Sequence, residues 1–186
     1  MILLARHGET EWNAIGRLQG HTDVELNATG RAQAQELATS LAAAQIAEVW
    51  SSDLARARET AAIVAGELGL APPRVDPELR ERRFGVFEGL TRDECAARYP
   101  DAWLAWTSYT EHPPGGESRD DAIVRMSRAI ARVHDGARGH ALVVSHGGVM
   151  RLWLGELTGT AIPPVGNGVV YDVEHDGAVF RATLRG

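Results

Sequence analysis

Apolar residues gather along this chain in short blocks that alternate with longer amphipathic stretches, a pattern that predicts strands followed by helices. Blocks of strand length lie at 1–5 (MILLA), 46–53 (IAEVWSSD) and 140–148 (HALVVSHGG), and the last of these carries the strongest signal. Residues 28–44 and 54–69 are rich in Ala and Leu, with apolar residues at helical spacing, so each predicts a helix. The chain therefore opens with two strand-helix units.

The second half of the chain restores this pattern after a loose segment. Residues 117–135 predict an amphipathic helix, with Ser118 as its N-cap. The apolar face of this helix is formed by Ile123, Met126, Ile130 and Val133. The run VMRLWLGELTG predicts another helix after the strand at 140–148, and the alternation at period two on either side of Asp176 and Gly177 predicts a hairpin. A short extended segment within PPRVDPELRE completes the predicted strands.

Strand-helix units of this kind build an α/β fold, here a three-layer, mostly parallel β-sheet with helices on both faces and an antiparallel pair at one edge. We expect a single domain over residues 1–186, because the chain is long enough for one full core and too short for two. Residues 83–116 predict only short helical pieces and the turn HPPGGES. We refer to this segment as the lid and expect it to be an insertion.

Composition and charge exclude several classes of partner. The 186 residues are 44% hydrophobic and carry a formal net charge of −6, and Lys and Arg form no run that would attract nucleic acid or an anionic membrane. No apolar stretch reaches the roughly 18 residues of a membrane span, and the first residues meet charge too soon for a signal peptide. We therefore expect a soluble, cytoplasmic protein. The single cysteine, Cys95, excludes an internal disulfide, a thiolate metal cluster and a redox pair.

Two of the predicted strands, ILLARHGE and ALVVSHGG, end in His-Gly. Because ligands gather at the carboxyl ends of strands in an open parallel sheet, His7 and His146 are expected to meet in one crevice. Arg6 precedes His7, and Arg56 and Arg58 open the helix that follows a third strand end. Guanidinium groups repel a metal cation but suit the oxygens of a phosphate, so this cluster predicts an anion site. The chain lacks the GxxxxGK[ST] run of a P-loop nucleotide site.

The same residues indicate phosphoryl chemistry. Cations close to His7 lower its pKa from about 6.5, which keeps a ring nitrogen free to attack phosphorus. The alkoxide that leaves needs a proton, and the loop ELRERRFGVFEG offers two carboxylates, Glu81 and Glu88. From the residues alone, both alternatives for the proton donor stay open.

Four segments, RHGETEWN, SSDLARARETA, LRERRFGVFEG and SHGGVMR, follow one another in this order along most of the chain. Together they resemble the histidine phosphatase superfamily, also called the phosphoglycerate mutase-like family, in its branch of cofactor-dependent mutases and small phosphatases. The resemblance implies a phosphohistidine on His7 and a proton donor at Glu81, the Glu of the family's L-x-E-x-x-x-G pattern. It leaves Glu88 to buttress the loop and Arg58 without a catalytic role. The residues that it places around the transferring phosphoryl group are Arg6, Gly8, Asn13, Arg56, His146 and Gly147.

The segment QGHTDVELNATG departs from the usual pattern of the family, G-W-x-D-x-x-L-[ST]-x-x-G. Gln19 and Gly20 are expected to bind substrate, whereas His21 matches no motif position and is expected at the surface. Asn27 stands where Ser or Thr is usual. Since Asn caps a helix as well as these residues do, the helix that begins near Ala28 is still expected.

The lid distinguishes between branches of the family. Glycolytic mutases have a larger insertion with a lysine-bearing stretch, whereas residues 90–116 are short and contain no lysine-rich segment. A mutase keeps water from its phosphohistidine and a phosphatase admits water, so the compact lid favours hydrolysis of a small phosphorylated metabolite, without a metal or cofactor. Two alternatives stay open: a phosphoglycerate mutase that depends on bisphosphoglycerate, and a non-catalytic module that binds a phosphorylated ligand.

Substrate choice is expected to depend on side chains of the lid, namely Trp103, Trp106, Tyr109 and His112. Trp103 and Trp106 fit equally well a packing role in a short helix. Apolar residues of the C-terminal hairpin either border a homodimer interface or close the core, and these are Val169, Val170 and Val173.

Overall fold

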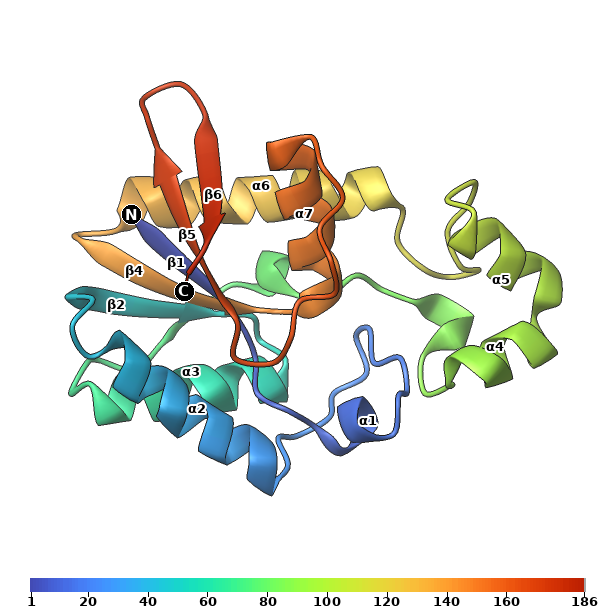
Figure 1. Ribbon diagram of the computed structural model, residues 1–186, viewed down its shortest axis with the longest axis horizontal. Coiled ribbons are helices and arrows are strands. Elements are labelled where there is room, and N and C mark those ends of the chain that lie inside the picture. The colour runs from blue at the N-terminus through green and yellow to red at the C-terminus, as the bar shows by residue number, and fades with distance from the viewer. Residues whose placement is uncertain (186) are drawn as a thin grey trace.

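The computed structural model describes residues 1–185, which contain one six-stranded sheet (Figure 1). The strands are β1 (Ile2–Arg6), β2 (Ile46–Ser51), β3 (Arg74–Val75), β4 (His140–Ser145), β5 (Val170–His175) and β6 (Phe180–Leu184). Their order across the sheet is β3-β2-β4-β1-β5-β6. The first four in this order pair in parallel, and β5 and β6 are antiparallel to their neighbours. The α/β fold class with an antiparallel edge is therefore confirmed.

Helices cover both faces of this sheet. They are α1 (Glu11–Ala14), α2 (Ala28–Leu41), α3 (Ala55–Glu67), α4 (Arg92–Arg98), α5 (Pro100–Thr107), α6 (Arg119–Gly136) and α7 (Gly147–Thr158), with short 3-10 helices η1 (Pro77–Leu79) and η2 (Gly85–Phe87). In Figure 1, α2 and α3 lie on one face and α6 and α7 on the other. Right-handed crossovers explain this division, because the chain steps outward from β1 to β3 and then returns to β4 on the opposite face.

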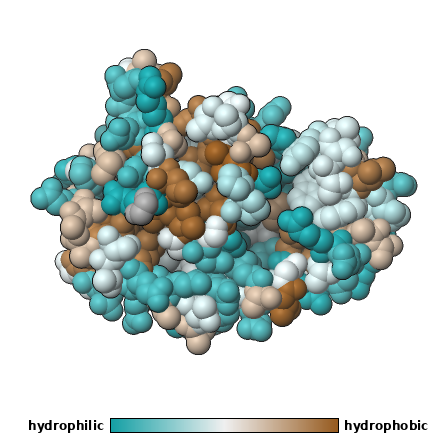
Figure 2. Space-filling model, viewed as in Figure 1, coloured by the Kyte–Doolittle hydropathy of each residue, from teal (hydrophilic) through white to brown (hydrophobic). Residues whose placement is uncertain are grey.

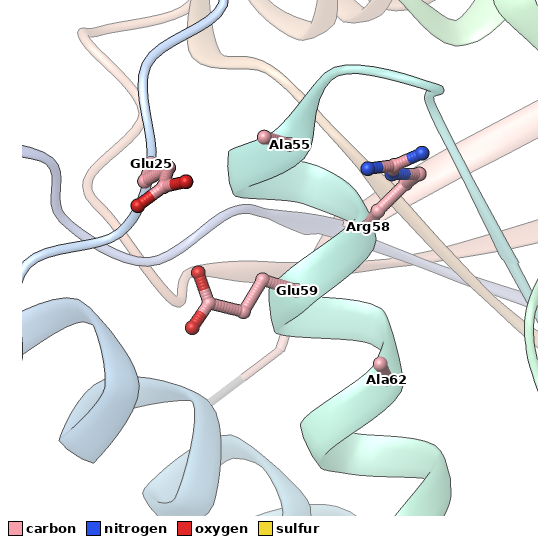
Figure 3. Close-up of a pocket in the computed structure, with 5 residues that line it drawn as sticks. All are labelled: Glu25, Ala55, Arg58, Glu59 and Ala62. Atoms are coloured by element: carbon pink, nitrogen blue, oxygen red, sulfur yellow. The ribbon is translucent and has the colours of Figure 1, made fainter.

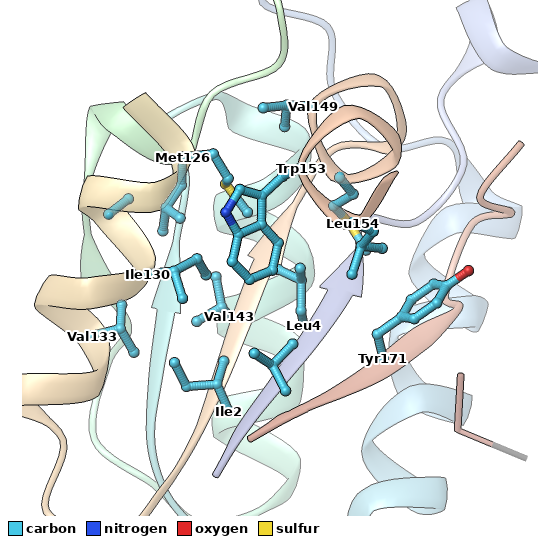
Figure 4. Close-up of a cluster of buried hydrophobic side chains, with 14 of the residues drawn as sticks. Ile2, Leu4, Met126, Ile130, Val133, Val143, Val149, Trp153, Leu154 and Tyr171 are labelled. Carbon is cyan, nitrogen blue, oxygen red and sulfur yellow. The ribbon is translucent and has the colours of Figure 1, made fainter. Parts of the chain in front are cut away.

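Each face of the sheet has its own apolar core. Successive residues of β1 point to opposite faces, so that Leu3 packs towards α2 and α3 and Leu4 packs towards α6 and α7. Figure 4 shows the core between the sheet and helices α6 and α7, where Trp153 of α7 lies near Leu4, Val143 of β4 and Ile130 of α6. A strand that is buried on both faces must be apolar along its whole length, which explains why the runs MILLA and HALVV do not alternate.

Several local predictions are confirmed. The side-chain oxygen of Asn27 accepts a hydrogen bond from the N–H of Gly30 at 2.8 Å and caps α2. Ser118 caps α6 by accepting from the N–H of Asp121 at 3.0 Å. The hairpin of β5 and β6 turns through Gly177, whose φ of +95° suits glycine.

Two elements differ from the prediction. The extended segment within PPRVDPELRE forms only the two residues of β3. Helix α1 was not predicted at all, because its four residues are too few to show a periodicity. It is held by a capping box in which Thr10 and Asn13 each bind the backbone N–H of the other.

The lid, residues 83–116, lies beside the sheet rather than on it, and contains η2, α4 and α5 (Figure 1). Its interior is built from aromatic rings whose neighbouring centroids lie 5.1–5.8 Å apart, those of Phe84, Phe87, Trp103 and Trp106. The buried Cys95 packs in the same cluster. Both tryptophans are therefore part of a small core that belongs to the lid itself.

Two chain segments connect the lid to the rest of the protein, and they cross at Gly85. A Cβ atom at Gly85 would lie 2.1 Å from the carbonyl oxygen of Pro114, and its φ of +54° also favours glycine. The N–H of Val86 donates to this carbonyl at 3.1 Å, and the N–H of Glu117 donates to the carbonyl of Arg83 at 2.9 Å. At this crossing the chain that enters the lid meets the chain that leaves it. The lid is also tied to residues 17 and 18, because the N–H of Leu18 donates to the carbonyl of Leu90 at 2.9 Å and Arg17 binds Glu94 at 2.8 Å.

Figure 2 shows the surface in the orientation of Figure 1. Hydrophobic residues gather near the centre of this face, close to the C-terminus, and hydrophilic residues cover most of the remainder. Over residues 1–185, no helix combines the length and the apolar character that crossing a membrane requires.

Candidate active site

His7 and His146 meet because they follow two neighbouring parallel strands. β1 and β4 pair in a register that sets Arg6 beside Ser145, so the next residue of each strand lies at the same edge of the sheet. The N–H of His7 donates to the carbonyl of Ser145 at 3.0 Å, and the two imidazole rings lie 5.0 Å apart between centroids. The predicted pair is brought together at the carboxyl edge.

The environment of His7 selects one form of its imidazole. Nδ1 lies 2.6 Å from the carbonyl oxygen of Gly8, which can only accept, so Nδ1 carries the proton and Nε2 keeps its lone pair. Burial lowers the pKa of His7 well below its usual 6.5, and the positive charges of Arg56 and Arg6 lower it further. His7 is therefore a neutral imidazole at physiological pH, with Nε2 available as a nucleophile.

Three contacts hold the backbone around His7. The N–H of Gly8 donates to Thr60 Oγ1 at 3.0 Å, and this hydroxyl in turn donates to the carbonyl of Arg56 at 2.8 Å. Asn167 donates from Nδ2 to the carbonyl of His7 at 2.8 Å. Sequence reasoning missed both residues: Thr60 lies within the segment SSDLARARETA but was given no role there, and Asn167 lies outside the four segments.

Arg6 and Arg56 are held by backbone carbonyls rather than by carboxylates. Arg6 Nη1 donates to the carbonyl of Val165 at 2.6 Å. Arg56 donates to the carbonyl of Thr22 at 3.0 Å and to that of Gly20 at 2.8 Å. Burial lowers the pKa of Arg6 and lowers that of Arg56 to about 10. Both groups stay positively charged at neutral pH, and their charge is available to a ligand.

Several buried polar atoms in this cluster have no hydrogen-bond partner among the described residues. They are Arg6 Nε, Arg56 Nε, His146 Nδ1 and His146 Nε2. His146 is fully buried, and burial together with the charge of Arg56 lowers its pKa well below the usual 6.5. Leaving such groups unpaired is costly, so an arrangement of this kind is typical of a site whose ligand supplies the missing acceptors. An oxyanion would provide both the acceptors and the opposite charge.

Glu81 lies at the N-terminus of α7, the helix that begins at the residue after His146. Its carboxylate accepts from the N–H of Gly148 at 2.8 Å, from that of Val149 at 2.7 Å and from that of Arg82 at 2.8 Å. The first N–H groups of a helix lack partners within the helix, and the side chain of Glu81 provides acceptors for two of them. The structure therefore places Glu81 beside the strand end that carries His146.

Glu88 has a different set of partners. Its carboxylate accepts from the N–H of His21 at 3.1 Å, from the N–H and hydroxyl of Thr22 at 3.0 and 2.8 Å, and from the N–H of Phe84 at 3.0 Å. A Cβ atom at Gly20 would lie 2.2 Å from Glu88 Oε1, and Gly20 has a φ of +53°. These bonds tie the segment around Gly20 to the start of the lid, the buttressing arrangement expected of Glu88.

The remaining predicted residues divide into those near the cluster and those away from it. Gln19 is buried, and its Oε1 has no partner within residues 1–185. Asn13 caps α1, and its Oδ1 lies 3.5 Å from Nδ2 of Asn167, the residue that holds the backbone of His7. Gly147 follows His146 directly, and a Cβ atom there would lie 3.1 Å from Arg6 Nε.

His21 and Arg58 lie in different surroundings. His21 is half-buried rather than on the surface, because its Nε2 donates to the carbonyl of Glu81 at 2.8 Å. Arg58 is exposed on α3, and Figure 3 shows its side chain directed away from Glu25 and Glu59, with which it lines a surface depression. Among residues 1–185, no group of three or more His, Cys, Asp or Glu side chains is placed to hold a metal ion.

This chain is similar to known proteins over most of its length. The model of the histidine phosphatase superfamily (branch 1) matches residues 2–182. "Phosphoglycerate mutase-like protein 4" of Arabidopsis thaliana is 45% identical over 155 residues, which cover 81% of this chain and 67% of that protein. "Metal-independent phosphoserine phosphatase" of Arabidopsis thaliana is 42% identical over 158 residues, 81% of this chain and 65% of that protein. This chain thus spans about two thirds of the length of these two relatives.

A solved structure is similar to this chain over nearly its whole length. The structure of mycobacterial glucosyl-3-phosphoglycerate phosphatase, in complex with VO3, superposes with a TM-score of 0.84 at 33% identity. The match covers 98% of this chain and 96% of the other.

Proposed function

Because the chain belongs to the histidine phosphatase superfamily, branch 1, we propose that it hydrolyses a small phosphomonoester through a phosphohistidine on His7. The observation that carries this proposal is a set of buried polar atoms without hydrogen-bond partners among residues 1–185: they belong to Arg6, Arg56 and His146, which cluster with His7, whose Nε2 is free. They surround the nucleophile with positive charge and hydrogen-bond donors, which is what the oxygens of a phosphoryl group require.

The first step transfers the phosphoryl group to the enzyme. Nε2 of His7 attacks phosphorus in line with the leaving oxygen, so that the P–N bond forms as the P–O bond breaks. Arg6, Arg56 and His146 bind the three oxygens that do not react; the charges of the two arginines and an N–H of the neutral His146 stabilise the transition state. Glu81 delivers a proton to the leaving oxygen, which departs as an alcohol.

The second step releases phosphate. Glu81, now a carboxylate, takes a proton from water, and the oxygen of this water attacks phosphorus as the P–N bond breaks. Inorganic phosphate leaves and His7 returns to its neutral form. Because no metal ion takes part in either step, Arg6 and Arg56 supply the positive charge in this scheme, and His146 supplies a hydrogen bond.

The substrate in this proposal is a small phosphorylated metabolite, in keeping with relatives named for phosphoserine and for glucosyl-3-phosphoglycerate. Gln19, Gly20 and Asn13 lie beside the cluster and are proposed to contact it. We propose that residues 1–186 act as one domain in which the lid borders the leaving group. A cytoplasmic location, a lack of nucleic-acid partners and a homodimer are further proposals; cell fractionation, filter binding and gel filtration test them. Val170 and Val173 of the C-terminal hairpin close the cores of the sheet, since only 7% and 1% of their surface is exposed.

The decisive experiment measures inorganic phosphate released from a panel of phosphomonoesters, with a chelator present, for the wild type and for His7→Ala. We expect activity that survives the chelator and disappears in a folded His7→Ala protein. Activity lost to the chelator would reject the metal-free scheme, and a fully active His7→Ala would reject the nucleophile.

The mutase alternative is favoured by similarity to proteins named phosphoglycerate mutase-like and 2,3-bisphosphoglycerate-dependent phosphoglycerate mutase, one of the latter being 37% identical over 88% of this chain. All 19 basic residues of this chain are arginines, so the lid has no lysine with which to bind a carboxylated substrate as the glycolytic mutases do. Interconversion of 3- and 2-phosphoglycerate, stimulated by catalytic bisphosphoglycerate, would establish the mutase. Tight phosphate binding without hydrolysis of any phosphomonoester would establish the binding module.

A further inference from the structure

The loop that carries Glu81 is held by side chains rather than by a strand or helix. Residues 80–84 have no regular secondary structure, yet Glu81 itself is buried. Four successive carbonyl oxygens, from residue 78 to residue 81, each accept a hydrogen bond from a side chain. Since buried backbone groups must be satisfied, the donors of these bonds determine where the loop lies.

Arg125 of α6 supplies three of these bonds. Its Nη1 donates to the carbonyl of Glu78 at 2.6 Å and to that of Arg80 at 3.0 Å, and its Nη2 donates to the carbonyl of Glu81 at 3.3 Å. The same guanidinium binds both carboxylate oxygens of Glu117 at 2.8 Å. Both side chains of this ion pair are largely buried, with 13% and 17% of their surface exposed. Arg125 therefore joins the Glu81 loop to the chain that leaves the lid.

His21 is the second donor to the carbonyl of Glu81. Its Nε2 donates to the oxygen of Glu81 at 2.8 Å, while its backbone N–H is held by Glu88. The residues before and after it, Gly20 and Thr22, bind the guanidinium of Arg56 through their carbonyls. His21 thus links the arginine of the phosphate pocket to the backbone of the proposed proton donor.

We propose that Arg125 and His21 are positioning residues for Glu81, which together hold its carbonyl so that its carboxylate stays at the N-terminus of α7 beside His146. The proposal rests on the function proposed above, in that Glu81 is taken to be the acid. Neither residue touches the reacting atoms. Each acts on the angle and depth at which Glu81 meets the leaving oxygen, a geometry to which proton transfer is sensitive.

Two substrates whose leaving groups differ in basicity distinguish the loss of a positioning residue from a general loss of structure. An alkyl phosphate such as β-glycerophosphate needs a proton on its leaving oxygen, whereas the stable p-nitrophenolate anion leaves without one. A misplaced acid therefore slows the first reaction and spares the second. A damaged phosphate pocket or an unstable fold slows both.

The experiment compares kcat/KM for these two substrates in four variants and in the reference variant Glu81→Gln. Arg125→Lys keeps the charge beside Glu117, but its single nitrogen cannot reach all the partners of the guanidinium. His21→Leu removes the second donor without leaving a buried charge unpaired, and His21→Gln restores a donor. The matched control, Arg128→Gln, removes an exposed arginine three residues further along α6 that binds the Glu78 carboxylate.

We expect Arg125→Lys and His21→Leu to lose about 10-fold or more with β-glycerophosphate and less than about 2-fold with p-nitrophenyl phosphate, with unchanged circular dichroism. His21→Gln should recover part of the loss, and Arg128→Gln should match the wild type with both substrates. Equal losses on both substrates, or none on either, would overturn the proposal. Glu81→Gln is the reference: if it fails to discriminate between the two substrates, Glu81 is not the acid, and the positioning role is rejected with it.

Discussion

Thr60 joins the backbone of the nucleophile segment to the arginine opposite it. Its hydroxyl accepts from the N–H of Gly8 and donates to the carbonyl of Arg56, and the residue is 1% exposed. We predict that Thr60→Val, which keeps the shape of the side chain, lowers the free energy of unfolding by about 1–3 kcal/mol, because a buried N–H is left unpaired. Urea titration measures this change. Thr39→Val removes an exposed hydroxyl of α2 that also bonds a backbone carbonyl, and serves as the control; equal effects of the two changes would contradict the prediction.

The buried imidazoles of His7 and His146 make the stability of the protein depend on pH. Both folded-state pKa values lie well below the usual 6.5, chiefly because of burial. Below about pH 6.5 the unfolded chain binds protons on these residues and the folded protein does not, so stability falls with decreasing pH by up to about 1.4 kcal/mol per pH unit for each imidazole. At higher pH both states are deprotonated, and this contribution to the slope disappears.

We therefore predict that the free energy of unfolding decreases between about pH 7.5 and about pH 5.5, and that His146→Gln makes this decrease smaller. Urea titrations in phosphate-free buffer at several pH values measure both slopes. A slope that is unchanged in His146→Gln would show that His146 does not contribute.

The sequence predicted that His7 and His146 would meet, but it did not predict the residues whose hydrogen bonds hold the backbone around them. Each histidine ends an apolar block, and blocks of this kind indicate strands whose ends meet. Asn167 binds the carbonyl of a residue 160 positions away, and Arg125 reaches carbonyls more than 40 positions away. Such hydrogen bonds leave no periodicity in the sequence, and the same residue types occur at many surface positions. His21 was expected at the surface for this reason.

At the scale of elements, α7 binds the acid through its first turn. A Cβ atom at Gly148 would lie 2.6 Å from Glu81 Oε1, so glycine is required there for the carboxylate to approach the helix N-terminus. Helix α7 itself would accept alanine, which favours helix formation by up to about 1 kcal/mol over glycine. Replacing Gly148 by alanine is thus expected to raise the stability of α7 and to lower the activity.

We predict that Gly148→Ala folds normally but loses about 10-fold or more of kcat/KM for an alkyl phosphate, because the carboxylate is displaced. Gly66→Ala in α3, where a Cβ atom would meet nothing within 4 Å, should keep full activity and gain a few tenths to about 1 kcal/mol of stability. Steady-state kinetics and thermal melts measure both. A fully active Gly148→Ala would show that the acid does not depend on this contact.

Element boundaries followed the sequence where an apolar pattern and a cap coincided. Asn27 and Ser118 mark the starts of α2 and α6, and the bounds of β2 and β4 lie within a few residues of the predicted blocks. β3 and α1 have two and four residues, which is less than one period of any recognisable pattern. Their existence depends on tertiary contacts, β3 on its pairing with β2 and α1 on its capping box.

At the scale of the whole molecule, the lid has a core of its own, separate from the two cores of the sheet. Trp103 lies 5.7 Å from Phe87 and 5.1 Å from Trp106 between ring centroids. We predict that Trp103→Ala loosens the lid, so that proteolysis within α4 and α5 increases and KM rises for bulky phosphomonoesters. Hydrolysis of p-nitrophenyl phosphate should change little, because the phosphate pocket lies on the sheet.

The control for this prediction is Leu104→Ala, which truncates the next residue of α5, 66% exposed. It should alter neither proteolysis nor KM. Unfolding of the whole protein by Trp103→Ala, with no preferential cleavage in the lid, would contradict the independence of the lid core.

The crossing at Gly85 has a consequence for how proteins of this architecture diversify. The chain between residues 86 and 113 begins and ends at one point, where Gly85 touches Pro114, Gly115 and Gly116. An insertion of another length that begins beyond Leu90 and returns to the same crossing shifts the register of none of the strands. It also keeps Glu88, whose bonds hold the segment that binds Arg56. The lid can therefore differ between related proteins, and with it the choice of substrate, while the reactive residues at the edge of the sheet stay the same.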